Sequence, residues 1–118
     1  MSVNGRVLIV EDDPAIREML AEYLSGQGFE VHQAEQGSDM RAEVERNLPD
    51  VVLLDVRLPD IDGFTVAGEL TSDGSGQAVV VISSSEDPLY PARAQSSGAL
   101  GFIAKHDVCG AALNRLLM

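Results

Sequence analysis

The chain has 118 residues, 45% of them hydrophobic, and its 19 acidic and 8 basic side chains give a formal net charge of −11. This length predicts one domain with a sizeable core. A segment with this much negative charge is not expected to bind nucleic acid directly, because phosphate backbones would repel it. The longest apolar run, residues 78–82, is far too short to cross a membrane. No secretory signal pattern opens the sequence and the single cysteine, Cys109, cannot form an internal disulfide, so we expect a cytoplasmic protein.

Strand-like and helix-like patterns alternate through the first half of the chain. The apolar run 7–10 is too short for a helix and predicts a strand. From Pro14, which suits a first helical turn, to the stop at Gly26, the apolar residues have helical spacing; they are Ile16, Met19, Leu20 and Leu24. A second strand is expected at 29–31. The helix expected next ends at Pro49, and its apolar face is formed by Met40, Val44 and Leu48.

The same alternation continues through the second half. Residues 51–54 predict a third strand, which ends at Asp55, and the turn 58–63 leads into a helix through Phe64, Ala67 and Leu70. After a polar loop at 72–76, a fourth strand is expected at 78–82 and a fifth at 101–104. The helix between them is expected to begin near Pro91, and a last helix covers 111–117.

Five strand–helix units predict an α/β fold with a parallel sheet and helices on both faces. The runs 51–54 and 78–82 are apolar without alternation, as expected for strands that are covered on both sides. We therefore expect residues 1–118 to form a single doubly wound domain with five strands and five helices. In a flavodoxin-like domain of this kind the strand order is 2-1-3-4-5.

Reactive side chains follow four of the five predicted strands. The first strand is followed by the acids 11–13, the third by Asp55, the fourth by Ser83 and the fifth by Lys105. In open α/β sheets, ligands bind beyond the carboxyl ends of the strands, and in the expected order these four strands are neighbours. The sequence therefore predicts that carboxylates, a hydroxyl and an ammonium meet at one edge of the sheet.

Such a constellation is suited to phosphoryl transfer onto a carboxylate. Clustered carboxylates repel one another, so one should titrate high unless a cation is present. Oxygen ligands of this kind suit Mg²⁺, and an aspartate can attack phosphorus to form an acyl phosphate. The metal, the hydroxyl and the lysine would neutralise the charge on the transferred oxygens.

With these residues in place, the sequence resembles the receiver domains of two-component response regulators along nearly its whole length. The resemblance rests on four blocks in order, and together they are highly specific. The blocks are Val7–Pro14, Asp50–Asp55 with Leu58-Pro59 and Asp62-Gly63, then Ser83, and Gly98–Lys105.

The resemblance implies a CheY-like fold and a role for each of these positions. Asp55 would be the phosphoacceptor, Ser83 would hold a phosphoryl oxygen and Lys105 would pair with the phosphoryl group. Mg²⁺ would be held by Asp55, by the acidic pair and by a backbone carbonyl. The pair consists of Glu11 and Asp12, with Asp12 as the direct ligand, and the carbonyl is that of Arg57.

Other positions have different expected roles. Phe102 occupies the position of the switch aromatic. Asp13 is expected to cap a helix, and Asp60 and Asp62 are expected to shape the turn before Gly63.

The resemblance also implies partners. The phosphoryl donor would be a sensor histidine kinase, and the face formed by the fourth helix, fifth strand and fifth helix would bind an output domain, a partner protein or a second copy of the domain. His106 follows Lys105 where the family often has a proline with a cis peptide bond; without proline a cis bond costs about 3 kcal/mol, so none is assumed. Receivers that lack this proline often precede helix-turn-helix output domains, which makes a longer regulator the alternative to a free-standing domain.

Three other functions compete with a non-enzymatic phosphoacceptor switch. The first is a Mg²⁺-dependent phosphohydrolase with an aspartate nucleophile. Phosphatases of the haloacid dehalogenase type have an Asp-x-Asp motif after the first strand, and this chain has Glu11-Asp12-Asp13 there instead. A flavin carrier needs a phosphate loop rich in Ser, Thr and Gly, whereas this loop is anionic. A phosphate-independent interaction module would not need a reactive residue at every key position. In this chain all of these positions are occupied, which argues against such a module.

Overall fold

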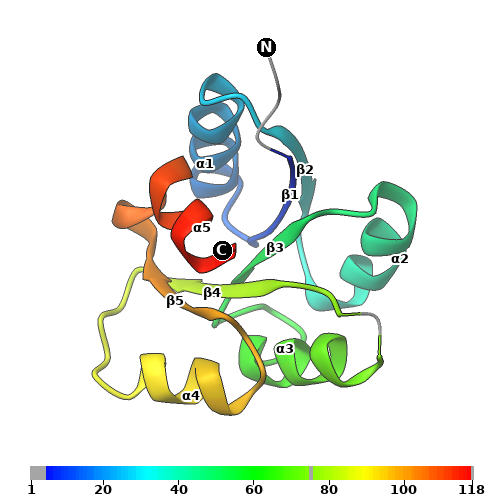
Figure 1. Ribbon diagram of the computed structural model, residues 1–118, viewed down its shortest axis with the longest axis vertical. Helices are drawn as coiled ribbons and strands as arrows, with labels where there is room; N and C mark the ends of the chain where they lie inside the picture. Colours follow the sequence, from blue (N-terminus) through cyan, green and yellow to red (C-terminus); the bar gives the residue numbers. More distant parts are fainter. Residues whose placement is uncertain (1–4, 75, 118) are drawn as a thin grey trace.

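The computed structural model describes residues 5–74 and 76–117, in which strands and helices alternate (Figure 1). The elements are β1 (Arg6–Val10), α1 (Pro14–Gly26), β2 (Glu30–Ala34), α2 (Gly37–Asn47), β3 (Val51–Asp55), α3 (Gly63–Ser72), β4 (Val79–Ser83), α4 (Tyr90–Ser96), β5 (Gly101–Ala104), the short 3₁₀ helix η1 (Lys105–Asp107) and α5 (Gly110–Leu117). None of the helices in these described ranges is long and apolar enough to cross a membrane.

The five strands form one parallel sheet in the order β2-β1-β3-β4-β5, which confirms the predicted topology. Val10 of β1 pairs with Leu54 of β3, and Asp55 pairs with Ile82 of β4. Ser83 in turn pairs with Ala104 of β5. The carboxyl ends of β1, β3, β4 and β5 therefore lie side by side along one edge of the sheet.

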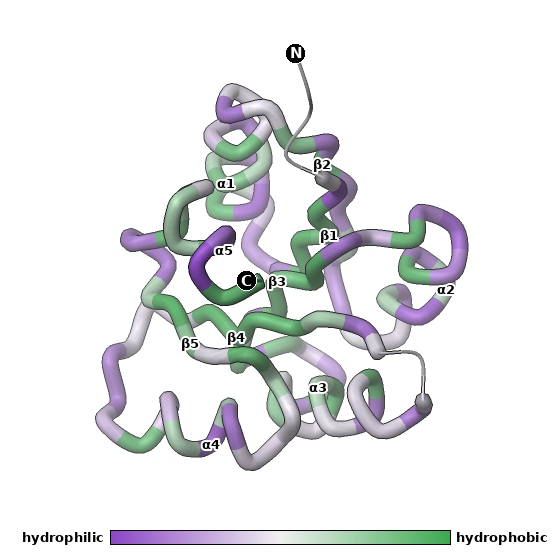
Figure 2. Tube along the Cα trace, viewed as in Figure 1, coloured by the Kyte–Doolittle hydropathy of each residue, from purple (hydrophilic) through white to green (hydrophobic). Residues whose placement is uncertain are grey.

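Helices cover both faces of the sheet (Figure 1). In β1 the side chains alternate between two apolar clusters: Leu8 and Val10 join residues of α2, α3 and α4, whereas Val7 and Ile9 join residues of α1 and α5. The apolar residues of β3 and β4 are all buried, as their unbroken apolar runs predict, and the polar residues that end these strands, Asp55 and Ser83, are buried as well. Figure 2 shows the hydrophobic positions concentrated along these central strands.

Two apolar residues do not lie where helical spacing predicts them. Leu48 is not part of the buried face of α2; it follows the end of the helix in a left-handed conformation with φ of 48° and is 69% exposed. The cause is Pro49, because a proline disfavours helical geometry in the residue before it. Met19 is 56% exposed, since α1 packs on the sheet through Leu20 and Leu24 and turns Met19 outward. The second strand begins at Glu30 rather than at Phe29, and it extends to Ala34.

Aspartates cap the two helices that start next to the acidic edge of the sheet. The Asp13 carboxylate accepts a hydrogen bond from the Ala15 N–H at 2.9 Å at the start of α1, in the capping role expected for it. The Asp62 carboxylate accepts one from the Phe64 N–H at 2.7 Å at the start of α3. Each cap fixes the direction in which the chain leaves the edge of the sheet.

The loop from β3 to α3 is held against its neighbours. Asp60 does more than shape a turn, because its two carboxylate oxygens accept hydrogen bonds from the N–H groups of Gly37 and Ser38, each at 2.9 Å, at the start of α2. At the other end of the loop, a Cβ atom at Gly63 would press against the backbone carbonyl oxygen of Asp55. A glycine is therefore required for α3 to begin this close to the end of β3.

Candidate functional site

Three carboxylates meet where β1 and β3 end. Glu11 directly follows β1 and Asp55 is the last residue of β3, and both are buried, with 1% and 4% of their surface exposed. Asp12 is exposed, and oxygen atoms of all three residues lie within 4.8 Å of one another. Asp13 is directed into the helix cap instead. Two of the three consecutive acids therefore join Asp55, and this set of oxygen ligands fits a hard divalent cation such as Mg²⁺.

Lys105 brings a positive charge from the end of β5 to this cluster. Its ammonium group forms an ion pair with Glu11 Oε1 and donates a hydrogen bond to Asp55 Oδ2 at 3.3 Å. The lysine side chain is only 11% exposed. Lys105 thus joins the carboxylates of two neighbouring strands, and sequence reasoning predicted its place at the site but not its contact with Glu11.

Burial raises the pKa of the Glu11 carboxyl to about 7, and the negative charge of Asp55 acts in the same direction while the hydrogen bond from Lys105 opposes it. Burial also acts to lower the pKa of the Lys105 ammonium, but its contact with Glu11 and the charge of Asp55 outweigh this and hold the pKa above its usual value. The cluster therefore combines a permanent cation with one carboxyl that is costly to ionise. A divalent cation at the same place would favour the ionised form of that carboxyl.

The carboxylates form one side of a small open cavity of about 270 Å³, to which Arg57, Ser83, Ser84, Ser85 and Lys105 also contribute. Ser83 is the last residue of β4 and is 4% exposed. Its hydroxyl oxygen accepts a hydrogen bond from the Ser85 N–H at 3.0 Å, which leaves the hydroxyl hydrogen available to a ligand. The Arg57 N–H donates to Asp55 Oδ1 at 3.3 Å and so helps to orient the central carboxylate.

Phe102, the expected switch aromatic, lies outside this cavity in a row of aromatic rings. Its ring meets that of Tyr90 edge to face with a centroid distance of 5.6 Å, and Tyr90 lies 5.6 Å from Phe64. The Cζ atom of the Arg93 guanidinium lies above the Phe64 ring, 4.2 Å from its centroid. The Nη2 atom of Arg93 also forms an ion pair with Asp62 Oδ2 at 3.7 Å. The row connects β5 with α4 and α3, and sequence analysis did not identify Tyr90 or Arg93, because their contacts join separate elements.

The peptide bond between Lys105 and His106 is trans, as is every other peptide bond among the described residues. The His106 ring lies 3.8 Å from a Glu86 oxygen and 3.6 Å from an oxygen of Asp107, and all three side chains are more than 60% exposed. Ion pairs this exposed contribute little to stability.

One known protein family covers most of the chain. The family model described as "Response regulator receiver domain" matches residues 7–110. The chain belongs to the response regulator receiver family. Receiver domains of this family work in two-component systems with histidine kinases and output domains, and they typically use Mg²⁺. The family consists of signalling modules rather than conventional enzymes.

Curated relatives of this receiver domain are longer regulators. It is 33% identical over 104 residues to the transcription regulator BvgA of Bordetella pertussis, an alignment that covers 87% of this chain and 50% of BvgA. It is 36% identical over 104 residues to the DNA-binding response regulator MtrA of Mycolicibacterium smegmatis, with coverage of 88% and 45%. The chain thus spans about half the length of these relatives.

Solved structures show the same architecture. The signal receiver domain of NarL from Mycobacterium tuberculosis is similar with a TM-score of 0.84 and 31% identity, and the match covers 98% of both chains. The BeF₃-activated receiver domain of RstA from Klebsiella pneumoniae is similar with a TM-score of 0.84 and 30% identity over 94% of both chains. These similarities confirm the CheY-like fold and the family expected from the sequence.

Proposed function

We propose that this receiver domain accepts a phosphoryl group on Asp55, with Mg²⁺, from a phosphohistidine of a sensor histidine kinase in the cytoplasm. The observation that carries the proposal is the position of the Asp55 carboxylate, which is buried at the end of β3 and lies beside Glu11, Asp12 and the ammonium of Lys105. A nucleophilic carboxylate, a set of oxygen ligands and a fixed cation are the components that phosphoryl transfer requires.

The proposed metal ligands are the carboxylates of Glu11, Asp12 and Asp55 and the backbone carbonyl of Arg57. Their chemistry fits, because oxygen atoms of the three acids already lie within 4.8 Å of one another and Mg²⁺ is bound in proteins by such oxygens together with water and phosphate. When bound, the metal would neutralise charge on the phosphoryl oxygens.

In the proposed reaction a carboxylate oxygen of Asp55 attacks the phosphorus atom in line with the leaving imidazole. The new O–P bond gives an acyl phosphate while the P–N bond of the phosphohistidine breaks, and its electron pair remains on the imidazole nitrogen. The Lys105 ammonium, already 3.3 Å from Asp55 Oδ2, pairs with one phosphoryl oxygen. The Ser83 hydroxyl donates its free hydrogen to another, since its oxygen is the acceptor in the contact with Ser85.

The same contacts provide a switch. The phosphoryl group adds negative charge beside Ser83 and Lys105, and the differential contacts that these residues gain favour a second conformation. Movement of Ser83 toward the phosphate would make room for Phe102 to turn, and Phe102 cannot turn without affecting its edge-to-face contact with Tyr90 of α4. The face formed by α4, β5 and α5 would then change and bind an output domain, a partner protein or a second copy of the domain.

Intact-mass measurement after incubation with acetyl phosphate and Mg²⁺ tests the assignment. We expect the unaltered domain to gain one phosphoryl group and Asp55→Asn to gain none. Asp62→Asn is the matched control: it removes a nearby carboxylate, retains an oxygen that can cap α3 and should be labelled normally. Equal labelling of the unaltered domain and Asp55→Asn would contradict the proposal, and continuous release of phosphate from a small ester would favour a phosphohydrolase.

A further inference from the structure

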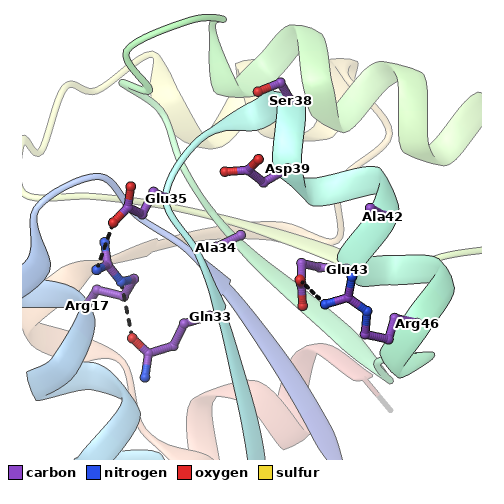
Figure 3. Close-up of a pocket in the computed structure, with 9 residues that line it drawn as sticks. All are labelled: Arg17, Gln33, Ala34, Glu35, Ser38, Asp39, Ala42, Glu43 and Arg46. Atoms are coloured by element: carbon purple, nitrogen blue, oxygen red, sulfur yellow. Dashed lines mark hydrogen bonds and ion pairs between the residues drawn. The ribbon is translucent and has the colours of Figure 1, made fainter.

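Arg17, which lies in α1 outside the acidic cavity, contacts the turn that connects β1 to α1. Its Nη1 donates a hydrogen bond to the backbone carbonyl of Glu11 at 2.9 Å. Its Nε donates to Gln33 Oε1 at 3.1 Å and its Nη2 to Glu35 Oε1 at 3.5 Å, as Figure 3 shows for the latter two contacts. The side chain is only 13% exposed, so the guanidinium is held by three partners in a largely buried position.

The opposite side of the same turn is fixed by β2. The Glu11 N–H donates a hydrogen bond to the carbonyl of Ala34 at 3.0 Å. Residues at the end of β2 therefore hold Glu11 twice, directly through Ala34 and through Gln33, which orients Arg17. Both polar groups of the Glu11 backbone are thus engaged outside the acidic cavity, and its carboxylate is left to face Lys105 and Asp55.

This arrangement also determines where the carboxylate of Asp12 can lie. The Glu11 carbonyl belongs to the peptide group that joins Glu11 to Asp12, so the orientation of this peptide sets the direction in which the Asp12 side chain leaves the backbone. Among residues 5–74 and 76–117, no side chain or N–H group donates a hydrogen bond to the Asp12 carboxylate. Its direction is therefore set by the backbone and by its own rotamer, and Arg17 is one of the two groups that hold this stretch of backbone, the other being Ala34.

A purely electrostatic role for Arg17 predicts the opposite effect on cation binding. A positive charge near a cation site repels the cation, so its removal would strengthen binding. The guanidinium, however, approaches Glu11 through the carbonyl, is paired with the solvent-exposed Glu35, and is not among the residues that form the acidic cavity. Positioning and repulsion can therefore be distinguished by the sign of the change in affinity.

We propose that Arg17 is a positioning residue for the Mg²⁺ site: it fixes the peptide between Glu11 and Asp12 so that both carboxylates face Asp55. The inference rests on the proposed function, because it assumes that these carboxylates bind the metal. Loss of a partner that orients metal ligands typically weakens metal binding by roughly 10-fold to 100-fold. We expect Arg17→Met to lie near the lower limit, about 10-fold, because Ala34 still holds the other side of the turn.

Mg²⁺ titration followed by NMR tests this inference in the whole domain. Arg17→Met should weaken Mg²⁺ binding about 10-fold, and Arg17→Lys, which keeps the charge and can reach one acceptor, should recover part of the loss. Arg46→Met is the matched control: Arg46 lies in the same polar groove between β2 and α2, pairs there with Glu43 (Figure 3), and its variant should bind Mg²⁺ normally.

Amide exchange without metal provides an independent measurement. The N–H groups of Glu11 and Asp13 are hydrogen-bonded to Ala34 and to the Glu11 carboxylate, and both should exchange faster in Arg17→Met. Unchanged or stronger Mg²⁺ binding by folded Arg17→Met would overturn the inference alone. An unaltered domain that binds no Mg²⁺ and accepts no phosphoryl group would overturn the proposed function and the inference with it.

Discussion

Glu11→Gln removes a buried carboxyl that is costly to ionise, and its effect on stability should depend on pH. In the folded protein, burial and the charge of Asp55 raise the pKa of Glu11 from 4.5 to about 7. Between these two values the unfolded chain has released the proton while the folded domain still holds it. The free energy of unfolding therefore falls as pH rises through this window, and the loss is complete above the folded-state pKa.

The size of the effect follows from the shift. A pKa unit corresponds to about 1.4 kcal/mol, so ionisation of Glu11 removes roughly 3 kcal/mol of stability from the metal-free domain. This is a large share of the total of about 5–15 kcal/mol expected for a folded domain. The lowered pKa values of Glu30 and Asp60 affect stability mainly at lower pH, and the raised pKa of Lys105 mainly at higher pH. The comparison of the unaltered domain with Glu11→Gln, in which every other ionisable group is the same, isolates the contribution of Glu11.

Urea denaturation without Mg²⁺ at about pH 5 and about pH 8 measures this difference. The unaltered domain should lose stability between the two conditions, and Glu11→Gln should lose roughly 3 kcal/mol less, because its amide does not ionise. Glu22→Gln, on the exposed side of α1, is the control and should follow the unaltered domain. The same loss in Glu11→Gln and the unaltered domain would refute the assignment of this pH dependence to Glu11.

Two further predictions concern the metal and the switch. Asp12→Ala should weaken Mg²⁺ binding much more than Asp13→Ala, because Asp13 faces the helix cap, and Asp13→Ala should instead cost about 1 kcal/mol of stability; similar losses of affinity in an NMR titration would mean that the orientation of the acidic turn is wrong. Beryllofluoride with Mg²⁺ should change amide exchange from about residue 83 to residue 111 and promote dimerisation or partner binding at the face of α4, β5 and α5. Changes confined to the loops around Asp55 would leave a phosphoacceptor without this switch.

Local patterns in the sequence determined the elements of the fold and the identity of the reactive groups. Apolar runs without alternation predicted β3 and β4 as strands buried on both faces, and the structure confirms this. The position of Asp55 at the end of such a run, together with acids after the first strand and a lysine after the fifth, indicated where the site would form. These predictions succeed because strand and helix periodicity act over a few residues, and because parallel strands bring their carboxyl ends to one edge.

Tertiary structure alone decided how these groups meet. Three consecutive acids in the sequence do not show which of them faces the cavity. In the structure, the backbone of Glu11, which precedes Asp12, is held by hydrogen bonds to Arg17 and to Ala34 of β2. The ion pair between Lys105 and Glu11 joins the ends of β5 and β1, which are not neighbouring strands, and the contact of Phe102 with Tyr90 joins β5 to α4. Such contacts depend on the distances between packed elements, and a pattern confined to neighbouring residues carries no information about those distances.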